Sequence, residues 1–292
     1  SPFIRIRSEV FHFQNLLNLD DSFIKLFRLY YFEYNLWYCF YSILFYFKKY
    51  KKVVLVGGVY YSPLIAVAEK RKVEVFELQH GIIHDLHLAY NFKNIYRSSF
   101  FANKLLLFSD YWKEACNFPI GTELVSVGCS QYRNVEVMRC ERSSGLLFIG
   151  SPLDNQIFFE FLNKNIEFLI ENGNVINFRL HPSDITLWKD KYPELVQWVK
   201  KGFVKVCEGE LSISHQLSKN NIVFCIDSSV IYESLWHGCK TFLFKGAHLR
   251  FLERIVRSGY INLISSSYQI KKSELIHDVL TPKGFFFDDV RI

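Results

Sequence analysis

Short apolar runs alternate with longer segments of helical periodicity from residue 53 onward. Each run has the length of a strand, and most runs end in a glycine or a polar residue. The predicted strands are Val53–Val56, Val73–Leu78, Lys104–Phe108, Leu124–Val127, Leu146–Ile149, Val175–Leu180, Phe203–Cys207, Ile222–Ile226 and Thr241–Phe244. The predicted helices are Ser62–Lys70, Tyr111–Asn117, Gln156–Asn172, Tyr192–Lys201, Ser212–Ser218, Val230–Gly238, Ala247–Ser258 and Lys272–Val279. Because parallel sheets covered by helices on both faces show this pattern, the chain is predicted to have an α/β fold.

A polar stretch at residues 139–145 interrupts the alternation and predicts a linker between two domains. The predicted organisation is an aromatic helical segment at residues 1–52, a Rossmann-like domain at 53–140 and a second one at 145–292. A chain of 292 residues is long enough to give both domains a core.

Aromatic residues make up 17% of the chain, and many of them lie between Phe23 and Phe47. Lys25, Arg28 and Glu33 interrupt this segment, so a membrane-spanning helix, which needs about 20 apolar residues, is not expected. Four lysines follow between positions 48 and 52. The segment predicts either a helix packed on the sheet or an interfacial helix that holds the chain at the inner face of the cytoplasmic membrane.

The net charge of +6 is mild and fits an anionic substrate or an anionic membrane surface. Nucleic acid is not an expected partner, because its binders usually carry a denser basic patch. The seven cysteines show no CxxC spacing, so we expect reduced thiols, no zinc site and no disulfides. This cysteine usage favours the cytoplasm.

Two predicted strands end in groups that bind anions. His181-Pro182 follows the run Val175–Leu180, and Asp227-Ser228-Ser229 follows Ile222–Ile226. In open α/β sheets, ligands bind at the carboxyl ends of the strands. Hydroxyl groups and backbone N–H groups at the start of the next helix can hold a phosphate. The pattern therefore predicts a nucleotide bound through its phosphate.

The motifs Gln79-His80-Gly81, Arg179-Leu180-His181-Pro182 and Asp227–Glu233, with Gly238 beyond the last of them, resemble those of GT-B glycosyltransferases. More narrowly, they resemble those of bacterial capsule and lipopolysaccharide sialyl-, polysialyl- and Kdo transferases, which use CMP-activated donors. The resemblance covers the layout of residues 53–265. It implies two Rossmann-like domains that face a cleft, with the acceptor on residues 53–140 and the nucleotide-sugar donor on 145–292. It also implies a glycan or lipid-linked glycan acceptor, and neither a metal ion nor another cofactor.

The resemblance also assigns the donor site. His181 would contact the donor phosphate, together with Ser228 and Ser229, whose alternative role is to cap the helix that follows. Glu233 would hold the ribose hydroxyls, unless it is a solvated helix carboxylate. Arg179 lies on the same face of its strand as His181 and would pair with a phosphate or a sugar carboxylate, or else form a salt bridge to a helix.

His80 is the expected catalytic base, because an inverting transfer requires a group that takes the proton of the acceptor hydroxyl. His84 or Asp85 would support His80 or replace it. With His87 these residues also suggest a metal site, which we disfavour because no matching carboxylate motif is present.

Glycines after two predicted strands allow a ligand to approach the backbone closely. Gly57 and Gly58 would do so on the acceptor side, and Gly150 with Ser151 on the donor side, although a tight turn alone would also explain them. No Walker loop, GxGxxG or GxSxG motif is present, which disfavours kinases, dehydrogenases and α/β-hydrolases.

The leading hypothesis is a glycosyltransferase of bacterial surface polysaccharide synthesis that transfers Kdo or sialic acid from CMP to a glycan hydroxyl. One alternative keeps the architecture with a UDP-, GDP- or phosphoribosyl-type donor. Another is a GT-B-like nucleotide-sugar epimerase or hydrolase. A third is a relative without catalytic activity that only scaffolds a membrane assembly.

Overall fold

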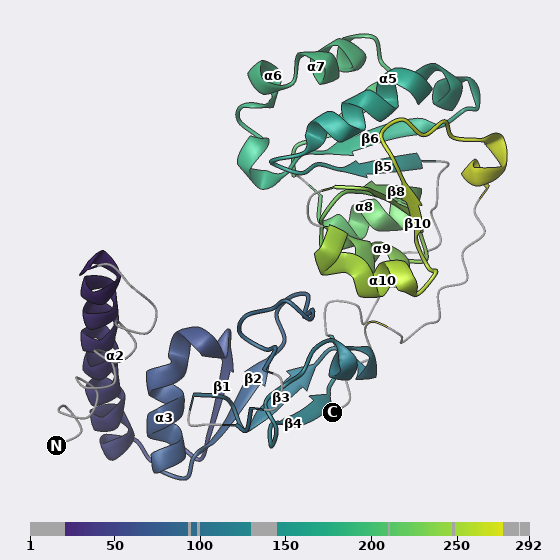
Figure 1. Cartoon of the computed structure of the whole chain (residues 1–292). Coiled ribbons are helices and arrows are strands. Elements are labelled where there is room, and N and C mark those ends of the chain that lie inside the picture. The colour runs from purple at the N-terminus through teal and green to yellow at the C-terminus, as the bar shows by residue number, and fades with distance from the viewer. Residues whose placement is uncertain are drawn as a thin grey trace. The chain divides into compact units, whose positions relative to one another are not determined.

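A computed structural model describes residues 21–92, 95–97, 100–129, 145–209, 211–246, 249–276 and 286. Two parallel sheets organise this part of the chain, as the alternating pattern predicted (Figure 1). Apart from Gly145, the predicted linker at 139–145 lies outside the described residues.

The first sheet has four strands in the order β1-β2-β3-β4, and its β1–β2 and β2–β3 pairs are parallel. Its elements and their neighbours are α2 (Asp21–Phe47), β1 (Lys52–Val56), η1 (Gly58–Tyr61), α3 (Ser62–Lys70), β2 (Glu74–Leu78), β3 (Lys104–Leu107), η2 (Asp110–Glu114) and β4 (Glu123–Ser126). Helix α3 begins with Pro63 in its first turn, where the missing N–H of proline costs nothing. Apolar side chains of α3, β1 and β2 form a core with Phe45 of α2.

The second sheet has six strands in the order β10-β9-β8-β5-β6-β7, and all neighbouring pairs are parallel. Its strands are β5 (Gly145–Ile149), β6 (Val175–Arg179), β7 (Val204–Cys207), β8 (Asn220–Cys225), β9 (Lys240–Phe244) and β10 (Asn262–Ile264). The helical elements are α5 (Asn155–Glu171), η5 (Pro182–Asp184), α6 (Trp188–Lys191), α7 (Pro193–Lys200), α8 (Ile213–Lys219), α9 (Val230–Trp236), η6 (Leu249–Leu252), α10 (Glu253–Arg257) and η7 (Lys272–Leu275). Counted from β5, the strand order is 3-2-1-4-5-6, which is the order of the Rossmann fold.

A row of four phenylalanines sets the register of the second sheet. Phe148 lies opposite Phe178 on one side and Phe224 on the other, and Phe224 lies opposite Phe242. The rings of Phe148 and Phe224 stack with centroids 4.4 Å apart and planes 8° from parallel. Because a slip in register would break every one of these contacts, the row holds the four strands level with one another.

The predicted strands are confirmed, with ends that differ by one or two residues. The short strand β10 was missed, because a three-residue run carries too little periodicity to be recognised. The segment predicted as the helix Tyr111–Asn117 contains the 3₁₀ helix η2. Helix α9 ends before the predicted Gly238, whose φ of +68° is a left-handed conformation that cannot continue a helix.

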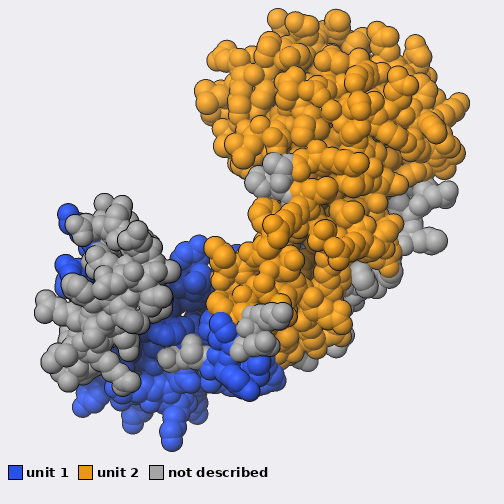
Figure 2. Space-filling view, viewed as in Figure 1, with its two compact units in different colours: residues 1–80, 94–106, 119–123 blue, residues 81–93, 107–118, 124–292 orange. Residues whose placement is uncertain are grey.

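By its contacts the chain forms two compact units (Figure 2). The first comprises residues 1–80, 94–106 and 119–123, and the second comprises 81–93, 107–118 and 124–292. The six-stranded sheet belongs to the second unit. The domain boundaries expected from the sequence (1–52, 53–140, 145–292) stay a prediction.

Candidate functional site

The strand ends singled out in the sequence lie along one edge of the second sheet. Strand β5 is hydrogen-bonded to β6 on one side and to β8 on the other, all in the same direction. The residues that follow these three strands therefore share the carboxyl edge, which brings together Gly150, Ser151, His181, Ser228 and Ser229. Between β5 and β8 the order of the strands reverses, and in open α/β sheets ligands bind at this switch point.

The loop after β6 orients the ring of His181. Nδ1 of His181 accepts a hydrogen bond from the backbone N–H of Ser183 at 3.2 Å and lies 2.7 Å from the Ser183 hydroxyl oxygen. A ring nitrogen that accepts a hydrogen bond carries no proton, so in the neutral imidazole the proton sits on Nε2. His181 therefore presents Nε2–H as a donor, which suits an anionic oxygen.

A chain of buried hydrogen bonds joins the loops after β5 and β6. The Tyr192 hydroxyl donates to Oδ2 of Asp184 at 2.8 Å and accepts from Nδ2 of Asn155 at 2.8 Å. Oδ1 of Asn155 accepts from the backbone N–H of Ser151 at 2.8 Å. All four residues are buried, so each of these polar groups depends on its partner. We call these residues the loop network.

Lys191 balances the charge of the loop network. Its Nζ donates to Oδ1 of Asp184 at 2.8 Å and to the Pro152 carbonyl oxygen at 3.2 Å. The hydrogen bond to Asp184 raises the pKa of Lys191. A buried carboxylate needs such a partner, because burying an unpaired charge is costly. The lysine thus ties the loop after β5 to the one after β6 a second time.

Gly150 is required by the sheet itself. Its N–H donates to the Arg179 carbonyl oxygen at 2.8 Å, and a Cβ atom at Gly150 would lie only 2.8 Å from that same oxygen. The close approach that calls for glycine here is therefore to the backbone of β6. This supports the tight-turn interpretation of Gly150.

Arg179 reaches toward α8 and the segment before it. Its Nη1 donates to the Leu211 carbonyl oxygen and to Oε1 of Gln216, both at 2.8 Å. The salt bridge considered as an alternative is thus replaced by hydrogen bonds to two neutral acceptors. Because Oε1 of Gln216 faces Arg179, the amide nitrogen Nε2 of Gln216 faces away from Arg179.

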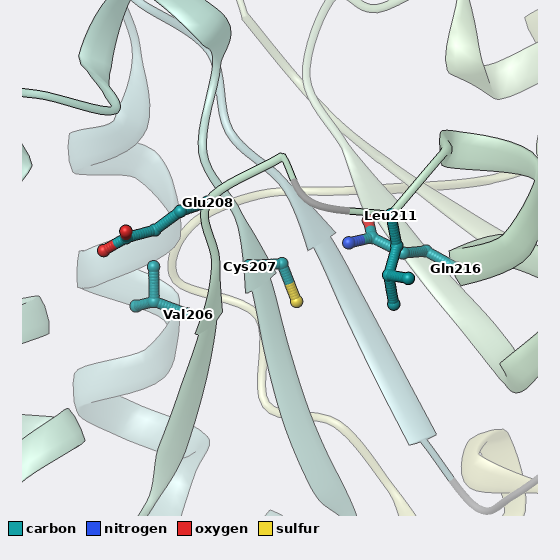
Figure 3. Close-up of a pocket in the computed structure, with 5 residues that line it drawn as sticks. All are labelled: Val206, Cys207, Glu208, Leu211 and Gln216. Carbon is teal, nitrogen blue, oxygen red and sulfur yellow. The ribbon is translucent and has the colours of Figure 1, made fainter.

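A pocket of about 170 Å³ lies beside this contact, at the carboxyl end of β7. It is lined by Val206, Cys207, Glu208, Leu211 and Gln216 (Figure 3). Gln216 is 4% exposed, and its Nε2 has no hydrogen-bond partner among the described residues. Figure 3 shows this nitrogen directed toward the side of the pocket that Cys207 forms. The sequence did not single out Gln216, because a glutamine in a short helix carries no distinctive signal.

The turn between β8 and α9 holds the two serines. The Ser228 hydroxyl accepts from the N–H of Val230 at 3.2 Å, whereas the side chain of Ser229 makes no capping hydrogen bond. Capping therefore falls to Ser228. Glu233 lies in the first turn of α9 and is half-buried. Because α9 has only seven residues, the groups of this turn that could hold an anion are the hydroxyls more than a helix dipole.

On the first sheet, His80 is exposed two residues after β2. Gly57 adopts a left-handed conformation with φ of +69°, and the N–H of Gly58 donates to Oε1 of Glu77 at 2.7 Å. Glu77 is a buried carboxylate that the sequence analysis missed. Its signal was its spacing of two residues from the buried Val75, which places both side chains on the same face of the strand. A side chain at Gly58 would collide with the Glu77 carboxylate, so both glycines have structural roles.

The histidines after His80 belong to the second unit. Nδ1 of His84 accepts from the N–H of Leu86 at 3.1 Å, and its ring lies 4.9 Å from that of Phe251. Burial lowers the pKa of His84, and the negative charge of Asp85 opposes this effect. Within the described residues, no group of three His, Cys, Asp or Glu side chains is arranged to hold a metal ion.

The loop network predicts a stability effect. Replacement of Tyr192 by Phe removes the hydrogen bonds of Nδ2 of Asn155 and of Oδ2 of Asp184, and a buried polar atom left unsatisfied costs about 1–3 kcal/mol. Tyr268→Phe is the control, because its hydroxyl bonds Glu274 at a more accessible position and water replaces the contact. Urea unfolding measures both. Equal losses of stability in the two variants would contradict the role given to the loop network.

His84 predicts a dependence on pH. Because its pKa is lowered in the folded chain, the unfolded chain binds the proton more tightly, and stability falls as the pH drops below the ordinary value of 6.5. Melting temperatures measured across this range should fall less for His84→Gln than for the wild type. His215→Gln controls for the loss of a histidine. An unchanged acid response in His84→Gln would remove this prediction.

No protein-family model matches the chain, and no curated protein matches it. Among solved structures it is similar to UDP-GlcNAc 2-epimerase from Methanocaldococcus jannaschii, with a TM-score of 0.59 and 14% identity over 87% of this chain and 78% of that one. It is also similar to another UDP-N-acetylglucosamine 2-epimerase, with a TM-score of 0.57 and 12% identity over 86% and 73% of the two chains. MurG from Acinetobacter baumannii gives a TM-score of 0.50 and 12% identity over 80% and 64%. The chain thus has the GT-B-like fold of two Rossmann-type parallel-sheet domains.

Proposed function

We propose that this protein is a glycosyltransferase whose nucleotide-sugar donor binds at the carboxyl edge of the second sheet. The carrying observation is the set of groups around the switch point. His181 offers an Nε2–H donor after β6, and Ser228 and Ser229 offer hydroxyls after β8. These donors match the oxygen atoms of a phosphate.

The base of the nucleotide would bind in the pocket beside Arg179. Its volume of about 170 Å³ suits one ring system, because pockets that hold a whole drug-sized ligand measure about 300–1,000 Å³. Nε2 of Gln216 can donate to a ring carbonyl of a pyrimidine, which would satisfy this buried nitrogen. In this proposal Arg179 is a positioning residue that orients the Gln216 amide. Glu233 would hold the ribose.

The proposed donor is a CMP-linked acidic sugar, Kdo or sialic acid, and the acceptor is a glycan hydroxyl of a bacterial surface polysaccharide. This choice rests on the motif resemblance around His80, His181 and Ser228. In the reaction the acceptor oxygen would bond to the anomeric carbon while the bond from that carbon to the phosphate oxygen breaks. The nucleotide leaves with the electron pair, and the proton of the acceptor passes to His80.

The second candidate is a nucleotide-sugar epimerase. Its support is the likeness in fold to two UDP-GlcNAc 2-epimerases, at TM-scores of 0.59 and 0.57. The two candidates differ in what they require. An epimerase converts UDP-GlcNAc without an acceptor, whereas a transferase turns over only when an acceptor hydroxyl is present.

The donor proposal predicts which nucleotides stabilise the chain. In a thermal-shift panel of CMP, CDP, UMP, UDP and GDP, the cytidine nucleotides should raise the melting temperature, since a ligand at 100 times its Kd stabilises by about 2.7 kcal/mol. Stabilisation by UDP or GDP with no effect of CMP or CDP would overturn the choice of donor.

Nucleotide binding by variants of the protein tests the role of the pocket. Gln216→Glu keeps an acceptor for Arg179 but replaces the donating nitrogen by an oxygen. Nucleotide affinity should fall by roughly tenfold or more, since an unpaired buried polar group costs about 1–3 kcal/mol. Gln197→Glu, at an exposed position of α7, is the matched control. Unchanged affinity in Gln216→Glu would place the base elsewhere.

The catalytic roles predict different kinetic defects. His80→Ala should lower turnover by about 10²–10⁴-fold with nucleotide affinity nearly unchanged, the effect of losing an acid–base group. His181→Ala should weaken nucleotide binding and turnover together, because its hydrogen bond to phosphate already exists in the ground state. His215→Ala is the control. Wild-type turnover in His80→Ala would move the base to Asp85 or His84.

A further inference from the structure

Helix α2 has one apolar face that is covered. Phe45 is 7% exposed and belongs to the core of α3, β1 and β2, with Tyr38 and Tyr41 packed against it. Figure 1 shows α2 standing beside α3. The spacing of three and four residues between Tyr38, Tyr41 and Phe45 places their side chains on one face of α2. This inner face accounts for the fold of α2 onto α3.

The opposite face of α2 is also apolar, and its described side chains are exposed. Its residues are Leu29, Phe32, Leu36, Phe40, Ile43 and Phe47, which are between 51% and 75% exposed. They too recur every three or four residues, so at 100° per residue they fall within about 80° of the helix circumference. We call them the outer stripe.

The outer stripe is a contiguous apolar surface, unlike the single apolar residues that are common on protein surfaces. At a rise of 1.5 Å per residue, its 18 steps extend over about 27 Å. Contiguous exposed apolar surface of this kind marks a site of interaction with a protein or a membrane. None of the helices in the described part of the chain is long and apolar enough to cross a membrane. An apolar stripe of this length along one side of a helix is suited to lie along a surface.

Charge identifies the partner. Lys48, Lys49, Lys51 and Lys52 follow the outer stripe directly and are exposed. At the other end Lys25 and Arg28 are exposed as well. If two copies of the chain paired through this stripe, cations would meet cations in a parallel arrangement, and the lysine cluster would meet Lys25 and Arg28 in an antiparallel one. Basic groups at both ends favour an anionic partner over a second copy.

Exposed aromatic side chains point to lipid. Trp37 and Tyr46 lie on either side of the outer stripe and are 44% and 68% exposed. Tyrosine and tryptophan favour the interface between headgroups and acyl chains, and lysines attract anionic headgroups. We propose that the outer stripe of α2 docks in the plane of an anionic lipid bilayer, with the lysine cluster at its headgroups. This inference is independent of the proposed reaction.

Vesicle binding by the full chain tests the proposal. We expect co-sedimentation with phosphatidylglycerol vesicles at low salt, weak binding to phosphatidylcholine vesicles, and release as salt screens the charges. Trp37 is the most exposed of the five tryptophans, so its fluorescence should shift to the blue on binding. The shift should disappear in Trp37→Phe.

Two multiple variants separate the apolar and the electrostatic contributions. Phe32→Gln, Leu36→Gln and Phe40→Gln together should abolish binding, with Tyr60→Gln and Leu88→Gln, which are 84% and 93% exposed elsewhere, as the control. Lys48→Glu, Lys49→Glu and Lys51→Glu together should weaken binding by at least about fivefold per lysine, the equivalent of about 1 kcal/mol each. Lys189→Glu, Lys200→Glu and Lys201→Glu form the control with equal charge. Circular dichroism checks that each variant is folded.

Three outcomes would overturn the proposal. The first is no binding to phosphatidylglycerol vesicles, and the second is equal loss of binding in the variants and their controls. The third is a wild-type dimer in light scattering that becomes a monomer only in the stripe variant while vesicles are not bound. That result would assign the outer stripe to a second copy of the chain. Nucleotide binding should be unchanged in every variant, so failure here is distinct from failure of the proposed function.

Discussion

The buried carboxylate of Asp184 constrains the whole candidate site. A carboxylate that is 3% exposed is stable only when hydrogen-bonded, and its partners Tyr192 and Lys191 come from the helices that follow the β6 loop. Through Tyr192 and Asn155 the same carboxylate reaches the backbone of Ser151 after β5. Two loops that would otherwise be free surface segments are thereby held against each other.

The second sheet determines where these loops begin. The in-register row of phenylalanines keeps β5, β6, β8 and β9 aligned, so their carboxyl ends reach the same edge. The Rossmann order then places the ends of β5 and β8 on either side of the switch point. Packing deep in the core thus determines how His181 and Ser228 are placed at the surface. The polar chemistry depends on an apolar constraint.

Helix α2 has two apolar faces, and only one of them is buried. One apolar face is used by the core, and a second one of similar periodicity is left exposed. In a protein that acted on small molecules in free solution, the second face would only favour aggregation. In the proposed function, a bilayer partner would hold the protein near acceptors that are attached to lipid. The two halves of the proposal, a nucleotide site and a surface-bound helix, are compatible without depending on each other.

Much of the fold was predictable from the sequence. Apolar runs of strand length, separated by segments of helical periodicity, predicted β1 to β9, although β1 is buried only at Leu55. The positions of His80, His181 and Ser228 at strand ends followed from the same pattern. The aromatic density and the lysines of the N-terminal segment pointed to an interfacial helix, but the sequence also allowed a helix packed on the sheet.

Only the tertiary structure decided which strands are neighbours and which polar groups meet. Asn155, Asp184 and Tyr192 are separated in sequence and look like ordinary helix and loop residues until folding brings their side chains together. The contact of Arg179 with Gln216 likewise depends on how α8 packs beside β6. The structure also shows that α2 packs one apolar face against the core and exposes a second one. Periodicity is a local property of the chain, whereas hydrogen-bond partners and exposure depend on residues that are distant in sequence.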